Sequence, residues 1–256
     1  MDILDFFKAE IDTISETDVR NGYYMMDLLG DDYYGITVFP QITLKEVLLK
    51  SVDSFKLYKS NSLIEKMDKE KRNISYITQG RAPFGFGIQM ILGKDNNILP
   101  TIICPRNVDC TSYAFFGHEF HHALKDVTIR ERKIRDRVAE VIPMFYEMLC
   151  VENENDEEVS KEILRRRVFL LQADKENETD DTTRQLQYFN SYYYALALYN
   201  KYKKKENKIL ILRLISRVLC GEINTLDLLN MLNIYDSDSD YIVSRELESI
   251  KQYIHL

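Results

Sequence analysis

The chain has 256 residues, 45% of them hydrophobic and 29% charged, which is the composition of a folded domain that buries a sizeable core. Its net charge of −7 excludes the basic surface on which nucleic-acid-binding proteins depend, so we expect no nucleic-acid partner. The sequence has no run of about 18 apolar residues, so we expect no membrane-spanning helix and no membrane partner.

Cysteine usage and the first residues bear on the location of the protein. The four cysteines form no CxxC pair and no disulfide framework. The chain does not open with a charged start followed by an apolar stretch, so no signal peptide is predicted. We therefore expect a cytoplasmic protein, and the sequence carries no indication of its oligomeric state.

Residues 1–74 are predicted to form a short N-terminal helical region. Apolar residues recur at near-helical spacing over 2–14 and again over 42–63, and turn residues at 30–32 separate the two stretches. The whole chain has only nine glycines and five prolines, so few positions can interrupt a helix. These patterns favour a mostly helical fold.

A short group of strand signals follows. Residues 74–78 are a strand candidate, and 80–87 are rich in glycine and indicate a loop. The runs 86–92 and 98–104 are apolar and rich in isoleucine, and five turn-forming residues separate them. We predict an antiparallel pair of strands from these two runs.

Helical periodicity continues from Thr111 to the end of the chain, and Thr111 and Ser112 are candidate helix caps. Basic clusters at 165–167 and 201–205 lie close to acidic runs, so we expect them to be solvated helix faces. The elements together predict an α+β protein, mainly α with a small β-sheet, in which residues 75–256 form one compact unit. Helix breaks are predicted near Asp126, Pro143, Glu152, Asp174, Lys205, Gly221 and Asp236.

Three of the four histidines lie together in a His-Glu-x-x-His motif. On a helix with about 100° per residue, His118 and His122 share one face about one turn apart, so both imidazoles can reach a single ion. Glu119 lies about 100° round from His118 and can address a water in the open position of that ion. Strongly apolar flanks indicate a buried helix, in which a metal would satisfy these polar side chains.

A third ligand is expected downstream, because a catalytic zinc site has three protein ligands and one open position. Glu140 is a lone charge among apolar neighbours, and its separation from His122 allows a turn and a second helix that returns alongside the first. Glu147 lies two helical turns further on and suits a carboxylate bonded to the other nitrogen of a ligand histidine. The alternative is that both are surface carboxylates. His121 is expected to be packed or to face substrate, although it could also approach the metal.

The motif with its flanks, His118-Glu119-Phe120-His121-His122-Ala123-Leu124, resembles the active helix of the thimet oligopeptidase and oligopeptidase F family of zinc peptidases. That helix reads His-Glu-Phe-Gly-His-Ala-Leu, so His121 replaces the family glycine. Glu140 and Glu147 match two acidic positions of the family, and the tyrosine-rich segment 192–195 and residues 220–236 resemble its C-terminal part. The resemblance covers about residues 75–256 and lacks most of the family's N-terminal helical roof.

The resemblance implies a zincin-like metallopeptidase core that holds one Zn²⁺ ion with His118, His122 and Glu140 and uses Glu119 as the base. It implies hydrolysis of peptide bonds in oligopeptides. By resemblance, Tyr194 is the first candidate and Tyr192 the second for a hydroxyl that stabilises the oxyanion, and the alternative is that both pack in a helix core.

We also expect an extended peptide to pair along residues 98–104, with the glycine-rich loop closing over it and Gly85, Phe86 and His121 in contact with it. Two other functions remain open at this point. One is a small metalloprotease that cuts a specific regulatory protein. The other is a zinc-binding interaction module without catalysis.

Overall fold

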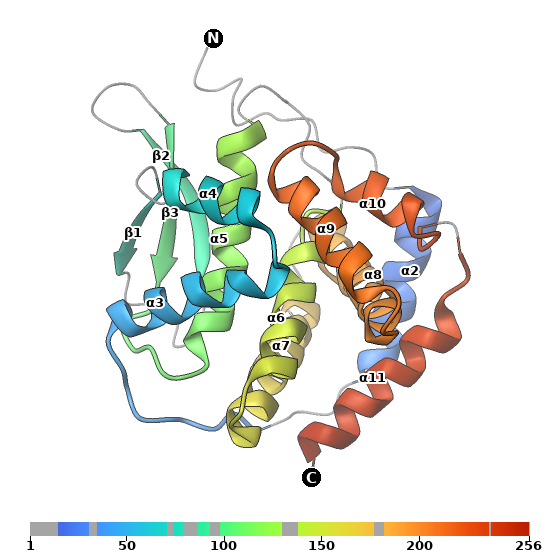
Figure 1. The fold of residues 1–256 in the computed structure, drawn as a ribbon. Coiled ribbons are helices and arrows are strands. Elements are labelled where there is room, and N and C mark those ends of the chain that lie inside the picture. Colours follow the sequence, from blue (N-terminus) through green and yellow to red (C-terminus); the bar gives the residue numbers. More distant parts are fainter. Residues whose placement is uncertain are drawn as a thin grey trace.

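Helices dominate the fold, and a sheet of three strands lies at one side of it (Figure 1). The prediction of a mainly α protein with a small β-sheet is therefore confirmed. The computed structural model describes residues 15–30, 35–70, 74–78, 86–92, 98–129, 138–176, 182–235 and 237–255. Within those ranges, no helix is both long and apolar enough to cross a bilayer.

Two of the first helices begin at reciprocal caps. In α2 (Glu16–Leu29), the Ser15 hydroxyl accepts the backbone N–H of Asp18 while the Asp18 carboxylate accepts that of Ser15. Thr43 and Glu46 cap α3 (Leu44–Ser54) in the same way. Next come η1 (Phe55–Tyr58) and α4 (Asn61–Glu70), so the helix predicted over 42–63 is divided. Lys59, with φ of 50°, separates these two elements. The helix predicted over 2–14 lies outside the described residues.

The sheet has the order β1-β3-β2. Strand β2 (Gly87–Leu92) pairs antiparallel with β3 (Ile98–Cys104), which confirms the predicted pair. Strand β1 (Ser75–Thr78) pairs parallel with the second half of β3. Strands β1 and β2 therefore flank β3 on both sides over its second half, so the expectation that a peptide pairs along 98–104 is wrong for residues 101–103. The predicted glycine-rich loop falls mostly at 79–85, outside the described residues. The predicted substrate-binding residue Gly85 therefore also lies outside them.

Seven helices follow the sheet among the described residues, and the breaks predicted near Asp126 and Pro143 lie two or three residues from the observed helix ends. The first helix continues through Asp126 to Ile129. Pro143 lies inside the first turn of the next helix, where a proline is tolerated because its missing N–H would have no partner within the helix. The helices are α5 (Ser112–Ile129), α6 (Val141–Asn153), α7 (Glu157–Glu176), α8 (Thr182–Lys203), α9 (Lys208–Leu219), α10 (Thr225–Met231) and α11 (Asp240–His255).

Helix α5 contacts both the sheet and several helices. It packs against β3 on one side and against α6 on another, while α3 and α9 also contact it (Figure 1). Helix α2 instead packs along α8, and Gly22 permits this because a Cβ there would meet Leu186 at 3.0–3.1 Å. Helices α2 and α3 therefore pack on two different helices of the later chain, α8 and α5.

Candidate metal centre

The start of α5 is fixed by a buried polar cap, and its middle by close contact with α6. Asp109 Oδ1 accepts the backbone N–H of Thr111 at 3.0 Å, and the hydroxyl of Ser112 accepts that of Asp109 at 2.9 Å. At Gly117, a Cβ would lie 2.3 Å from the hydroxyl oxygen of Tyr146 and 2.4–2.5 Å from its ring. Only glycine therefore allows α5 to approach α6 this closely.

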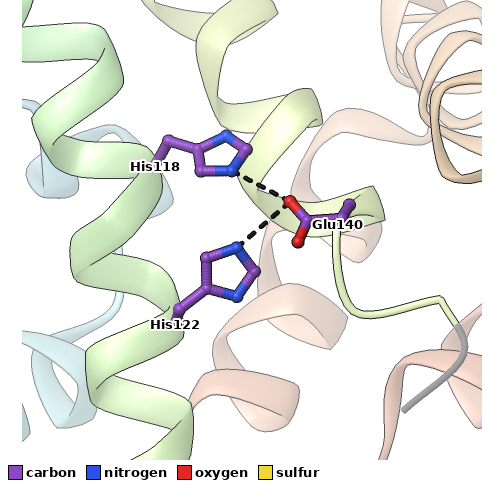
Figure 2. A group of neighbouring side chains, drawn as sticks. All are labelled: His118, His122 and Glu140. Carbon is purple, nitrogen blue, oxygen red and sulfur yellow. Dashed lines mark hydrogen bonds and ion pairs between the residues drawn. The ribbon is translucent and has the colours of Figure 1, made fainter. Parts of the chain in front are cut away.

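This approach brings three side chains together. His118 Nε2 lies 3.0 Å and His122 Nε2 lies 3.1 Å from the same oxygen, Oε2 of Glu140. Figure 2 shows the two imidazoles projecting from one face of α5 toward the carboxylate. Glu140 is the residue that precedes α6, and its side chain makes no capping hydrogen bond to that helix. The carboxylate is therefore directed at the histidines.

The donor set fits a zinc ion. One nitrogen of each histidine and one oxygen of Glu140 all lie within 4.8 Å of one another. Two ligand atoms on a tetrahedral zinc ion, each about 2.0–2.1 Å from the metal, lie about 3.3 Å apart. The distances of 3.0 and 3.1 Å between the two Nε2 atoms and the Glu140 oxygen need to lengthen only slightly to reach that spacing. Two imidazoles and one carboxylate are also the ligand types of catalytic zinc sites.

Two further charged side chains, Glu147 and Arg167, are buried behind His118. His118 Nδ1 lies 2.7 Å from Glu147 Oε1, and because a carboxylate only accepts, the imidazole donates. The guanidinium of Arg167, on α7, donates from Nε to Glu147 Oε2 at 2.7 Å and from Nη2 to Oε1. Both nitrogens of His118 therefore face carboxylates, one from Glu140 and one from Glu147.

The protonation of these groups follows from burial and from their partners. Burial alone lowers the pKa of His118, but its hydrogen bonds with Glu140 and Glu147 outweigh that effect and raise the pKa to about 9. Burial raises the pKa of Glu140 as well, yet His122 and His118 hold it well below the ordinary value. The pKa of Glu147 is also lowered, because Arg167 and His118 outweigh its burial. Both carboxylates are thus held in the anionic form.

Glu119 is not one of the three residues whose ligand atoms converge, although it is close to both histidines. Burial raises the pKa of its carboxyl, and the nearby charges of His118 and His122 oppose that shift. Its charge also acts on Cys104 at the end of β3, whose pKa burial raises to about 12. Glu119 is therefore close enough to both histidines and to Cys104 for the groups to influence one another electrostatically. A small, mostly apolar pocket adjoins the group, lined by His121, His122 and Ala139 with side chains of α6, α9 and α10.

His121 points away from the group and into an aromatic core. Its ring stacks on Phe55 with centroids 4.4 Å apart. Its Nδ1 donates to the Gly117 carbonyl at 2.6 Å, so its Nε2 accepts from the hydroxyl of Tyr58 at 2.7 Å. With 1% of its surface exposed, His121 is packed, and it also lines the small pocket beside His122.

The two candidate tyrosines are core residues. Tyr194 is fully buried and its hydroxyl donates to Asp18 at 3.3 Å and accepts from Asn21 at 3.2 Å, both on α2. Tyr192 is also fully buried, and its hydroxyl has no hydrogen-bond partner among the described residues. The structure thus favours the helix-core alternative for both. Phe86, just before β2, packs edge-to-face on Phe116 of α5, with centroids 6.2 Å apart.

Arg167 was not among the predicted site residues, because the basic cluster at 165–167 was expected to be a solvated helix face, and this expectation is wrong for Arg166 and Arg167. Arg166 and Arg167 are in fact only 3% and 7% exposed. Arg166 is buried against Asp109, which it contacts at 2.6 Å, and Glu162, at 3.0 Å. The missed signal is helical spacing, because Ile163, Leu164 and Leu171 lie three or four residues from Arg167 and are all buried.

No protein-family model, curated protein or solved structure matches the chain. The likeness to the oligopeptidases therefore rests on the motif residues themselves. The chemistry of the site therefore follows from the side chains that meet between α5, α6 and α7.

Proposed function

We propose that the protein is a zinc-dependent peptidase with a zincin-like core, in which His118, His122 and Glu140 hold one Zn²⁺ ion. The observation that carries this proposal is the convergence of the two Nε2 atoms on one oxygen of Glu140 at 3.0 and 3.1 Å. The hydrogen bond from His118 to Glu147 adds support, because metal-bound histidines usually donate their other nitrogen to a carboxylate or carbonyl.

The reaction is hydrolysis of a peptide bond by water. Zinc bound at this group would supply a Lewis acid that makes a water more acidic and polarises the scissile carbonyl. Glu119 accepts the proton of the attacking water and passes it to the departing amine.

The substrate we propose is a peptide, with oligopeptides as the first class to examine. The pocket beside His122 is mostly apolar and has room for about one water molecule, so it sets no preference among peptide side chains. A single intact protein as substrate is the alternative, and parallel digestion of mixed peptides and of folded proteins separates the two.

A second candidate is a zinc-binding interaction module without turnover. The observation in its favour is that both tyrosines expected to stabilise the oxyanion are buried in the core, with 0% of their surface exposed. This candidate predicts tight zinc binding without hydrolysis of any peptide.

The test is to measure zinc by elemental analysis of the purified protein and then to follow cleavage of a mixed peptide library by mass spectrometry. We expect about one zinc per chain and cleavage that Glu119→Gln abolishes without loss of zinc. The variant removes the base but none of the three ligands. Zinc-loaded protein that cleaves nothing would favour the module, and a protein that takes up no zinc would refute both candidates.

A further inference from the structure

Two adjacent arginines of α7 are buried, and each meets carboxylates from other parts of the fold. Arg166 reaches Asp109 at the start of α5, whereas Arg167 reaches Glu147 on α6, directly behind His118. We propose that Arg167 is a positioning residue for the metal centre, which acts on His118 through Glu147. This inference rests on the proposed metal site.

The geometry of the contact is that of a fork on a carboxylate. Arg167 places Nε 2.7 Å from Oε2 of Glu147 and directs Nη2 to Oε1, so both oxygens are held at once. Oε1 is also the atom that accepts from Nδ1 of His118. One oxygen therefore has two donors, the imidazole and the guanidinium, and its direction is fixed from both sides.

The same contact settles which nitrogen of His118 faces the other ligands. Arg167 Nη2 lies 3.2 Å from His118 Nδ1, and neither group can accept from the other while Nδ1 carries the hydrogen donated to Glu147. With Nδ1 occupied in this way, Nε2 is the nitrogen left for a metal, on the side of Glu140. Arg167 thus holds Glu147 in the position that sets both the tautomer and the ring direction.

A lysine in the same place would not do this equally well. Its ammonium is a compact charge without a planar pair of donors, whereas a guanidinium matches both oxygens of a carboxylate. Burial strengthens the need for an arginine opposite Glu147, because that carboxylate is 2% exposed and a buried carboxylate without a partner is unfavourable. A residue that only balanced this charge would be replaceable by lysine, and a positioning residue would not.

Arg166 is the matched control, because it lies on the same helix, is buried to a similar degree and pairs with carboxylates that do not touch the histidines. We would measure zinc dissociation constants by competition with a chromophoric chelator for the wild type, Arg167→Met, Arg167→Lys and Arg166→Met. The visible absorption spectrum of each Co²⁺-loaded protein would report the coordination geometry. Thermal unfolding would record the loss of stability separately.

For Arg167→Met we expect zinc affinity to fall by about 10- to 100-fold, the range found when a partner of a metal ligand is removed. Arg167→Lys, which should fold more readily because it keeps the charge, should still bind zinc several-fold more weakly, with an altered Co²⁺ spectrum. Arg166→Met should lose stability yet keep the affinity of the wild type.

Two results would overturn the inference while leaving the metal site intact. One is an Arg167→Lys protein with the affinity and spectrum of the wild type. The other is equal loss of affinity in Arg166→Met and Arg167→Met, which would mean that burial of any arginine of α7 is all that matters. Failure of the wild type itself to bind zinc would refute the proposed function and this inference with it.

Discussion

Two faces of one helix give adjacent histidines opposite roles. His122 turns toward α6 and the carboxylate of Glu140, whereas His121, the residue before it, is enclosed by aromatic rings of η1 and α6. The contrast in protonation is widest between His121 and His118, three residues earlier. Carboxylates raise the pKa of His118 to about 9, whereas burial lowers that of His121 to about 3.

This difference shows that the surroundings, and not the type of residue, decide what a histidine does. A charged pocket keeps His118 hydrogen-bonded on both ring nitrogens by carboxylates that also suit a cation. The aromatic pocket instead keeps His121 neutral, with one nitrogen donating and the other accepting. One face of α5 is thus the proposed binding face, and the other is a packing face.

The strongest test of the contrast between the two faces is to replace one histidine on each face with alanine. We expect His122→Ala to lower zinc affinity by more than about 100-fold, since loss of a ligand should exceed loss of its hydrogen-bond partner. His121→Ala should leave that affinity nearly unchanged but lower the free energy of unfolding by roughly 2–4 kcal/mol, because it opens a cavity between the rings. Chelator competition and urea unfolding measure the two quantities, and equal effects of both variants on zinc would remove the distinction.

Much of the binding face was predictable because it depends on local spacing. The turn between His118 and His122 follows from helical periodicity, and Glu140 stands out as a charge among apolar neighbours. The hairpin of β2 and β3 likewise follows from two apolar runs around a turn. In each case, the pattern and the contact lie within a short stretch of chain.

The failures concern contacts between distant segments. The direction of Tyr194 depends on how α2 docks on α8, and its partner Asp18 is 176 residues away. The central place of β3 depends on the parallel pairing of β1, which no local pattern reveals. Arg167 was not predicted for another reason. The basic cluster at 165–167 was interpreted from its composition alone, without regard to the apolar residues at helical spacing from Arg167.

A smaller effect should follow from Gly117→Ala, which acts on the packing face. The new Cβ would overlap the ring of Tyr146, which itself packs against Phe55 and His121. Overpacking typically costs about 1–3 kcal/mol, and better helix propensity returns up to about 1 kcal/mol, so we expect a net loss of roughly 1–2 kcal/mol in urea unfolding. Gly35→Ala is the control, because a Cβ there meets nothing within 4 Å among the described residues. A Gly117→Ala protein as stable as this control would show that Tyr146 can move freely.

The smallest effect should be on the pH dependence of stability, measured on protein treated with a chelator. His121 has a folded pKa of about 3, whereas an unfolded histidine titrates near about 6.5, so below that pH only the unfolded chain takes up the proton. The resulting loss of stability from pH 7 to 5.5 should be about 1.2 kcal/mol. His118 has the opposite sign: its contribution is complete below about 6.5 and is lost as the pH rises through about 9.

The difference in slope between the wild type and His121→Gln isolates His121, since the other titrating groups are common to both proteins. We expect the variant to lose less stability than the wild type between pH 7 and 5.5, by about the amount given for His121 alone. Parallel curves would mean that the aromatic pocket admits a protonated imidazole. In that case, the contrast between the two faces of α5 would be one of geometry alone and not of charge.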